Sequence, residues 1–441
     1  MMPLMKKNRA LALLLALAAP AALAQTVDFD GSSRLPAASA PEFPKPSQES
    51  RKPRKPKPSR PPEVPPSAPS GSVSFNGATL PARAFSRLDR IPDSLIAAID
   101  ATRAVLRLAL YELDLPGVTD AIVRAKRRGV DVKLIYDMSH GGTAAGANAG
   151  GEAEGGNEPG LSSGPSAQFT QLVDAGVETR LLKGNGSGIM HNKIAIFDGE
   201  LVETGSFNWS MAADQVNFEN ALFRDDSSLA SLYASYWDWM WTYGEPAGAS
   251  APSGPREESK FGEPPVDPSP SVSYKGQSWP RASFSPGGGT EARLAGAISR
   301  CERTLDIAIF SFYSKTVADA VAAAKARGVA VRVVGDASQA RRSPEIADLI
   351  GGGVPLRLSA GRGGKGVLHH KFALLDGEML ATGSFNFSQN AEKNNFENQF
   401  YTTDADDLAG YQAEFEAVWD QAHAPALGEL QDADAGGVVL R

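Results

Sequence analysis

The chain has 441 residues, of which 42% are hydrophobic, and a formal net charge of -7 at pH 7. This length exceeds the need of one ordinary domain, so two core-forming units plus extensions are expected. The acidic balance argues against a broad basic surface for DNA or RNA, although a local basic cleft could still bind them. The single cysteine, Cys301, has no partner for a disulfide within the chain, and five histidines without a cysteine cluster give no support to a zinc site.

The first 24 residues match a secretory signal peptide. Lys6, Lys7 and Arg9 precede an apolar run that ends in small residues at Ala24, which is the order of zones in such signals. No later run is apolar for long enough to cross a bilayer. We therefore expect cleavage after Ala24 and a secreted or periplasmic protein that is soluble or peripheral to a membrane.

Composition divides the rest of the chain. Residues 25–71 are rich in proline, serine and basic side chains, which predicts a disordered linker that is either a plain spacer or a tether on an anionic surface. The expected division is 1–24 signal peptide, 25–71 basic linker, 72–243 first domain, 244–270 second linker, 271–428 second domain and 429–441 tail.

The two domains are internal repeats of one another. Residues 72–77 recur as residues 271–276, and Asp137 recurs as Asp336, with no gap in between. The first copy then holds extra residues in a stretch rich in glycine and alanine, residues 141–168, which is expected to be a flexible surface loop.

Taken in chain order, each copy alternates helical periodicity with short β-rich runs. The first copy predicts a helix over 95–104, a strand over 105–110, a helix over 118–128 and a strand over 130–136, and the second predicts the same at 294–301, 305–310, 316–327 and 329–334. A last helix in each copy spaces aromatic residues four apart for core packing, at Tyr233, Trp237 and Trp241 and at Tyr411, Phe415 and Trp419. The fold class is therefore α/β.

Before its last helix, each copy contains a set of polar residues that is expected to carry the chemistry. The set is His191, Lys193, Asp198, Ser206, Asn208 and Glu219 in the first copy, and His369, Lys371, Asp376, Ser384, Asn386 and Glu397 in the second. A repeat kept only for packing would preserve mainly its apolar positions, so these polar matches indicate a functional site.

The spacing within the set predicts one shared surface. His191 and Lys193 are two apart in a predicted strand, so they point to the same face. A turn at Asp198 brings a second strand back, and Ser206 and Asn208 can then join that face. An imidazole, a fixed cation and neutral donors suit a phosphodiester, whose oxygens gain negative charge during reaction. The expected phosphate ligands are Lys193, Ser206, Asn208, Lys371, Ser384 and Asn386, while Asp198 and Asp376 are interpreted as structural.

One copy has a single motif histidine, whereas displacing an alcohol from phosphorus needs both an attacking group and a proton donor. Two copies facing each other across a pseudo-two-fold axis supply both. Glu219 and Glu397 are the expected partners of imidazole Nδ1, which leaves Nε2 to face the phosphorus. His370, next to His369, should point to the opposite side of its strand.

Both copies resemble the His-x-Lys-x4-Asp signature of the phospholipase D superfamily, with its Gly-Ser-x-Asn and Asn-x-Glu segments. The resemblance covers nearly all of residues 72–425 and is strongest to the branch of small nucleases and cardiolipin hydrolases. It implies two homologous α/β domains, each a mixed sheet flanked by helices, packed about a pseudo-two-fold axis. It also implies a phosphohistidine intermediate, no metal or other cofactor, His191 as nucleophile, and His369 as general acid and later base.

Three functions stay open at this point. A phospholipase D acting on head-group phosphodiesters at an anionic membrane surface is favoured over a metal-independent endonuclease acting on DNA or RNA. The third, an envelope-tethered module that binds anionic polymers, is disfavoured by the intact motifs. Trp209 could stack on a base, lie at a lipid interface or pack in the core, and Arg362 could touch a second phosphate. No obligate protein partner is evident.

Overall fold

The computed structural model describes residues 71–141, 165–248, 261–426 and 429–430. The chain divides into two units, Met1–Glu63 and Val64–Arg441, and every described residue belongs to the second. The expected signal peptide, nearly all of the basic linker and most of the 141–168 loop lie outside the described residues.

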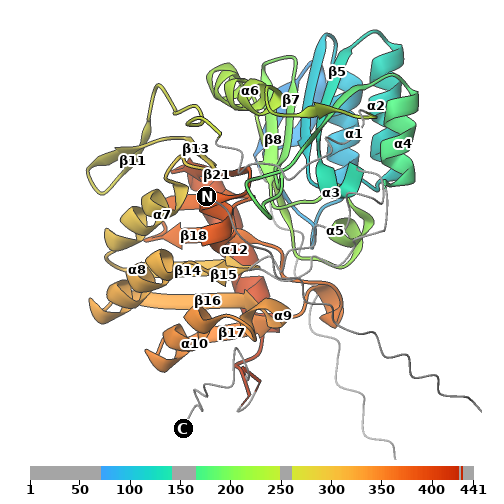
Figure 1. Ribbon diagram of the computed structural model, residues 1–441. Coiled ribbons are helices and arrows are strands. Elements are labelled where there is room, and N and C mark those ends of the chain that lie inside the picture. The colour runs from blue at the N-terminus through green and yellow to red at the C-terminus, as the bar shows by residue number, and fades with distance from the viewer. Residues whose placement is uncertain (1–70, 142–164, 249–260, 427–428, 431–441) are drawn as a thin grey trace, which may run out of the picture. The chain divides into compact units, whose positions relative to one another are not determined.

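The first half is built on one mixed β-sheet with helices on both faces (Figure 1). Its strands are β1 Ser72–Phe75, β2 Ala78–Pro81, β3 Arg83–Phe85, β4 Val105–Leu110, β5 Asp131–Asp137, β6 Glu178–Leu182, β7 Lys193–Phe197, β8 Leu201–Gly205, β9 Asn220–Arg224 and β10 Glu245–Pro246. Its helices are α1 Ile91–Ala101, α2 Pro116–Arg127, α3 Met138–Gly141, α4 Ala167–Asp174, α5 Met211–Gln215 and α6 Ser227–Trp241. The strand order is β10-β6-β5-β4-β7-β8-β9-β3, parallel from β4 to β6 and antiparallel from β4 through β7, β8 and β9, while β1 and β2 form a separate hairpin.

The second half repeats this plan. Its strands are β11 Val272–Tyr274, β12 Gln277–Trp279, β13 Ala282–Ser285, β14 Thr304–Ile309, β15 Phe312–Tyr313, β16 Ala330–Asp336, β17 Leu356–Ser359, β18 Lys371–Leu375, β19 Met379–Gly383, β20 Phe387–Ser388 and β21 Glu397–Thr402. Its helices are α7 Thr290–Ser299, α8 Lys315–Ala326, α9 Ala337–Ala340, α10 Pro344–Gly351, the 3-10 turn η1 Arg362–Gly364, α11 Gln389–Lys393 and α12 Ala405–Gln421. The main sheet has the order β13-β21-β19-β18-β14-β16-β17, so the strand that follows each motif histidine, β7 or β18, lies in the middle of its sheet.

The predicted α/β alternation is confirmed, with small shifts at the helix ends. β4 has the predicted bounds, whereas the helix predicted over residues 95–104 begins and ends earlier, as α1. It begins earlier because Pro92 fits the first turn of a helix. It ends earlier because the N–H groups of residues 103–105 donate to the Asp198 carboxylate.

Local signals explain where the helices beside the site begin and end. α2 starts at Pro116, and the Ser314 hydroxyl caps α8 by accepting from the Val317 N–H at 3.0 Å. Gly129 and Gly328 follow these two helices with φ of 92° and 94°. Side chains other than glycine rarely adopt that conformation, so the glycines end the helices there.

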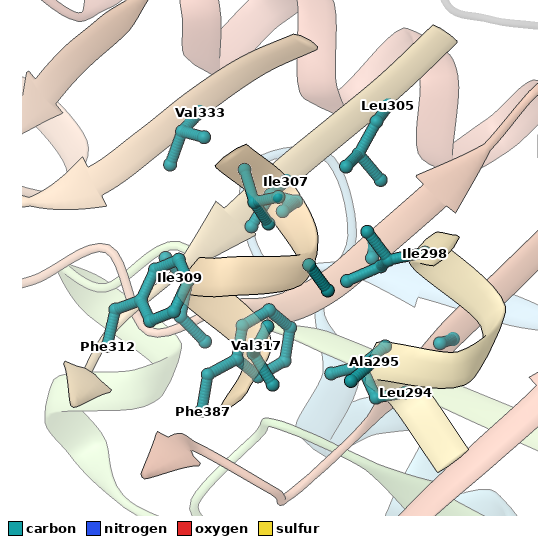
Figure 2. Packing of buried hydrophobic residues seen from close by; sticks show 14 of the residues in the cluster. Leu294, Ala295, Ile298, Leu305, Ile307, Ile309, Phe312, Val317, Val333 and Phe387 are labelled. Atoms are coloured by element: carbon teal, nitrogen blue, oxygen red, sulfur yellow. The ribbon is translucent and has the colours of Figure 1, made fainter. Parts of the chain in front are cut away.

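Hydrophobic residues cover both faces of each sheet. In the second half, α7 and α8 pack on β14 through Leu294, Ile298 and Val317, which lie against Leu305 and Ile307 (Figure 2). All five are fully buried, and each contributes roughly 1.5–3 kcal/mol relative to exposure. The equivalent layer of the first half lies under α1, α2 and α4.

A further hydrophobic cluster joins the two halves. It contains side chains from the inner faces of both sheets and from α6 and α12. The aromatic residues predicted to pack do so here: Tyr233 and Tyr411 are fully buried, and Phe415 stacks on Trp419 with ring centroids 5.8 Å apart. Because the two helices lie between the sheets, the halves share one core.

The segment before the first motif histidine reaches into the second half. The Asn185 N–H donates to the Asn394 carbonyl at 2.9 Å. A Cβ at Gly188 would lie 2.3 Å from the same carbonyl oxygen, so only glycine fits there. This close approach fixes residues 184–190 against the partner half.

Residues 361–368, ahead of the second motif histidine, make the equivalent crossing in the other direction. The Arg362 N–H donates to the Val216 carbonyl at 2.8 Å, and a Cβ at Gly366 would lie 2.7 Å from that oxygen. The Arg362 guanidinium donates to the Ser86 carbonyl at 2.5 Å. Arg362 therefore holds the first half's loops in this structure.

Candidate active site

Backbone hydrogen bonds between the halves place the two motif histidines. The His191 N–H donates to the Phe396 carbonyl at 3.0 Å, and the His369 N–H donates to the Phe218 carbonyl at 3.0 Å. Phe396 and Phe218 each precede the motif glutamate of their own half by one residue. Each histidine is thereby brought next to the glutamate of the other half.

Crossed histidine–glutamate pairs form the centre of the site. His191 Nδ1 lies 2.8 Å from Glu397 Oε2, and His369 Nδ1 lies 2.8 Å from Glu219 Oε1. All four side chains are buried. A carboxylate can only accept, so Nδ1 carries the hydrogen in both rings and the glutamates fix the orientation of the imidazoles.

The geometry between the two imidazoles suits one shared substrate. The ring centroids of His191 and His369 are 6.4 Å apart, with their planes at 86°. Because the two imidazoles face each other edge to face, both could reach one phosphorus atom from opposite sides. Neither half holds this arrangement alone, because each pair takes its glutamate from the other half.

The motif lysines lie beside the histidines on the same face. Lys193 Nζ donates to the His191 carbonyl at 2.8 Å, and Lys371 Nζ donates to the His369 carbonyl at 2.8 Å. Both lysines are buried. Their positive charge is held beside the imidazoles by this contact to the histidine backbone.

An aromatic ring supports each histidine and lysine. Tyr111 lies 4.9 Å from His191 between ring centroids and 5.0 Å from Lys193 Nζ. Phe310 makes the equivalent contacts in the second half, 4.9 Å from its histidine and 5.1 Å from its lysine. The sequence did not identify these two residues as part of the site, although the repeat aligns them.

Two aspartates fix the residue before each histidine. The Met190 N–H donates to Asp137 Oδ2 at 2.8 Å, and the Leu368 N–H donates to Asp336 Oδ2 at 2.9 Å. Burial raises the pKa of Asp336 above its ordinary value despite several hydrogen bonds that lower it. These aspartates were not among the candidate residues, and their equivalence in the repeat is the signal that could have found them.

The motif serines face the glutamates and asparagines. The Ser206 hydroxyl donates to Glu219 Oε2 at 2.6 Å and accepts from the Asn220 N–H at 3.0 Å. The Ser384 hydroxyl accepts from the Asn398 N–H at 3.0 Å. In this structure Ser206 therefore orients Glu219, and its role as a phosphate ligand stays a prediction.

Asn208 and Asn386 follow the second strand of each motif, where Asn208 is buried and Asn386 is partly buried. Their backbones turn tightly, with the Ser210 N–H donating to the Asn208 carbonyl at 2.7 Å and the Ser388 N–H to the Asn386 carbonyl at 2.8 Å. Within the described part of the chain, Asn386 Oδ1 meets no hydrogen-bond donor. Both amides thus lie just after the second motif strand of their half, and their role as phosphate ligands stays a prediction.

Asp198 and Asp376 lie at the far end of their strands from the histidines. Asp198 has a φ of 51° and accepts from the N–H groups of Ala104 and Val105 at 2.8 and 2.9 Å. Although burial alone would raise it, these N–H donors hold the pKa of Asp198 below its ordinary value. Both aspartates tie a turn to the start of the neighbouring strand.

Trp209 is fully buried in the core of the first half, where it pairs with Leu113. Of the three roles that the sequence left open for it, the structure shows packing. Among the described residues, no group of histidine, cysteine, aspartate and glutamate side chains is arranged to hold a metal ion. Every helix in those residues is too short or too polar to span a bilayer.

Comparison with known proteins identifies the family. A family model described as "Cardiolipin synthase, PLD-like domain" matches residues 95–241 and 294–419, which is more than half of the chain. The chain belongs to this PLD-like family. The two matched regions contain the two crossed histidine–glutamate pairs between them, so the phospholipase D resemblance of the sequence is confirmed.

Curated relatives of this PLD-like chain cover part of its length. A mitochondrial cardiolipin hydrolase from Xenopus tropicalis is 37% identical over 136 residues, which is 31% of this chain and 63% of that protein. A phospholipase D from Rickettsia typhi is 27% identical over 150 residues, covering 32% of this chain and 59% of the relative. The chain thus spans less than two thirds of either relative.

A solved structure reproduces the two-half arrangement of the PLD-like fold. Phosphatidylserine synthase from Haemophilus influenzae aligns with a TM-score of 0.54 over 77% of this chain and 86% of its own. The two sequences are 14% identical, so this likeness shows the fold alone.

Proposed function

We propose that this PLD-like protein hydrolyses phosphodiesters at one site that both halves build. The observation that carries the proposal is the crossed pairing of His191 with Glu397 and of His369 with Glu219. It supplies two imidazoles whose ring centroids are 6.4 Å apart, each oriented through Nδ1 by a glutamate, together with buried lysines. One imidazole can attack phosphorus, and the other can protonate the leaving oxygen.

In the first step of the proposed reaction, His191 Nε2 attacks phosphorus and forms an N–P bond while the bond to the leaving oxygen breaks. His369, protonated at the start, gives its Nε2 proton to that oxygen and releases an alcohol. Attack makes the His191 ring positive, and the Glu397 carboxylate stabilises that charge. Lys193 and Lys371 stabilise the negative charge on the phosphoryl oxygens.

In the second step water attacks the phosphorus and loses a proton to His369, and the N–P bond breaks. The products are a phosphomonoester, a free His191 and a protonated His369 ready for the next substrate. The assignment of His191 as nucleophile follows the order of roles that the family resemblance implies. No step requires a metal ion.

Phospholipids are the proposed substrate class, with head-group hydrolysis releasing phosphatidate. Support comes from the similarity to a cardiolipin hydrolase and to a phospholipase D. Burial of Trp209 removes both the base-stacking and the lipid-interface role that the sequence had left open for it, so this residue favours neither substrate class. We further propose that residues 1–24 direct export, which places the enzyme next to envelope lipids.

The test uses the purified protein in EDTA with vesicles of phosphatidylcholine and cardiolipin and, in parallel, with single-stranded and plasmid DNA. His191→Ala is the matched control. We expect phosphatidate from the vesicles, intact DNA, and no product with His191→Ala. Wild type that is denatured rapidly at alkaline pH, where a phosphohistidine bond survives, should carry label from a ³²P-labelled lipid phosphate, and His191→Ala should not.

The alternative outcomes are distinct. Nicked DNA with untouched lipid would move the substrate class to nucleic acid and keep the site. Equal activity of wild type and His191→Ala would contradict the proposed role of the site.

A further inference from the structure

The residue after each motif histidine differs between the halves, and so does its partner on the last helix. Asn192 Nδ2 donates to the Tyr236 hydroxyl at 3.2 Å in the first half. At the equivalent positions of the second half, His370 Nε2 lies 3.3 Å from Glu414 Oε1. All four side chains are buried. A neutral pair on one side of the pseudo-two-fold axis thus corresponds to a titratable pair on the other.

The amide of Asn220 fixes the hydrogen on His370. Asn220 Oδ1 accepts from the Tyr411 hydroxyl at 2.9 Å and from the Thr382 hydroxyl at 3.3 Å. Its Nδ2 therefore faces the other way and donates to His370 Nδ1 at 2.9 Å and to Ser206 Oγ at 3.2 Å. His370 Nδ1 must accept, so the hydrogen is on Nε2, which donates to Glu414.

This network ends on the histidine proposed to transfer protons. Ser206 donates to Glu219 Oε2 at 2.6 Å, and Glu219 accepts from His369 Nδ1. A continuous series of hydrogen bonds therefore runs from Glu414 through His370, Asn220 and Ser206 to the Glu219–His369 pair. A proton on His370 Nδ1 would point at the Asn220 amide hydrogens and break the series.

Charged groups surround the outer end of the network. Arg87 pairs with Glu414 at 2.9 Å, with the arginine side chain 25% exposed and the glutamate fully buried. Asp89 lies in the same loop, and burial, with Glu414 nearby, raises its pKa above the ordinary value. The Arg362 guanidinium lies close enough to interact with both Glu219 and Glu414. Glu414 is thus held by a cation at the edge of the fold while it accepts from His370.

We propose that His370 and Glu414 are positioning residues for His369, and that they make the two motif histidines unequal. They hold Asn220 and Ser206 so that Glu219 keeps the His369 ring oriented for proton transfer. In the first half, Asn192 Oδ1 accepts from Asn398 Nδ2 at 3.0 Å. Neither Asn192 nor its partner Tyr236 can take up a proton near neutral pH. The inference rests on the proposed phosphodiesterase function and assigns proton transfer to the second half.

The test replaces the second-half pair by its first-half counterpart, in His370→Asn/Glu414→Tyr. Two probes are compared, phosphatidylcholine and the same lipid with p-nitrophenol in place of choline. The nitrophenolate leaves without help from an acid, whereas the choline alkoxide needs a proton. Because both lipids give the same intermediate on His191, the comparison uses kcat/KM, which reports the first step. We expect the variant to lose about tenfold or more in kcat/KM on phosphatidylcholine and less than about threefold on the nitrophenyl lipid.

A pH profile gives a second readout on the same proteins. The kcat/KM of the variant on phosphatidylcholine should depend on pH differently from that of the wild type, because the contacts that orient the His369 ring through Asn220 and Ser206 are changed only in the variant. Glu414→Gln, which keeps the size of the side chain, should shift both readouts in the same direction if the double variant does not fold. His423→Asn, in an exposed pair with Glu429, is the control that should leave both probes unchanged.

Equal losses on the two probes, or no loss on either, would overturn the positioning role while leaving the proposed function intact. A wild type that cleaves neither probe would instead count against the proposed function.

Discussion

Carboxylates that are buried or partly buried in this protein differ in what surrounds them. Asp198 and Asp376 accept from several backbone N–H groups at the start of the next strand, which keeps their charged form favourable inside the fold. Glu203 is fully buried, and the Trp209 indole is its neighbour. Within the described residues, neither carboxyl oxygen of Glu203 has a hydrogen-bond donor in bonding geometry. Burial therefore raises the pKa of Glu203 well above its ordinary value, despite the neighbouring indole.

Asp376→Asn should destabilise the second half. Although burial opposes it, the N–H groups of Arg303, Thr304 and Glu302 lower the pKa of Asp376. A carboxyl whose pKa is lower in the folded than in the unfolded state stabilises the fold at pH values above its unfolded pKa of about 4. This contribution to stability is lost as the pH falls below that value. We expect a loss of about 1–3 kcal/mol at pH 7 that shrinks below pH 4, measured by urea unfolding. A loss independent of pH would contradict this reason.

Glu203→Gln should stabilise the protein at neutral pH. Because the folded pKa is raised, wild-type stability falls as pH rises above the unfolded value of about 4.3. Glutamine has no charge to bury. The free energy of unfolding of the variant minus that of the wild type should therefore be larger at pH 8 than at pH 4 by at least about 1 kcal/mol. Parallel stability curves for the two proteins would show that Glu203 is not neutral in the fold. The second half has Ala381 at the equivalent position, which shows that the fold does not need the carboxyl.

At the level of elements, the two segments that cross between the halves position the histidines. They act as short, glycine-dependent connections, and their carbonyl and N–H contacts place each histidine beside the opposite glutamate. A change at Gly188 should therefore disturb the His191–Glu397 pair without touching either side chain.

Gly188→Ala should lower both stability and activity. Its Cβ would lie 2.3 Å from the Asn394 oxygen, so the segment or its neighbour must shift, at a cost of about 1–3 kcal/mol. Gly351→Ala is the matched control, because its Cβ would enter open space at the end of α10. Thermal unfolding and the vesicle assay would check both variants. If Gly188→Ala behaves like Gly351→Ala, the crossing does not position the site.

Periodicity and the internal repeat predicted the elements and the motif residues, because both depend on local spacing. Alternation along a strand put His191 and Lys193 on one face and His370 on the other. Alternation cannot say what the opposite half places against a face, so the crossing of the glutamates and the partner of His370 were not predicted. Asp137 and Tyr111 were visible as repeated positions, but their contact with the motif depends on strand order.

On the scale of the whole described unit, duplication turns two incomplete half-sites into one. The shared core around α6 and α12 and the two crossing segments fix the halves against each other. Rigid placement matters here because both imidazoles must reach the same phosphorus atom. An approximate symmetry is therefore compatible with different roles for His191 and His369, set by their unlike neighbours.

The most direct test of the joint site compares His191→Ala and His369→Ala with wild type in the same phosphodiesterase assay. Two independent sites would leave each single variant with about half of the activity. One joint site predicts that each variant alone loses at least about 100-fold in kcat, and that the double variant loses little more. Retention of about half the wild-type rate by either single variant would contradict the account.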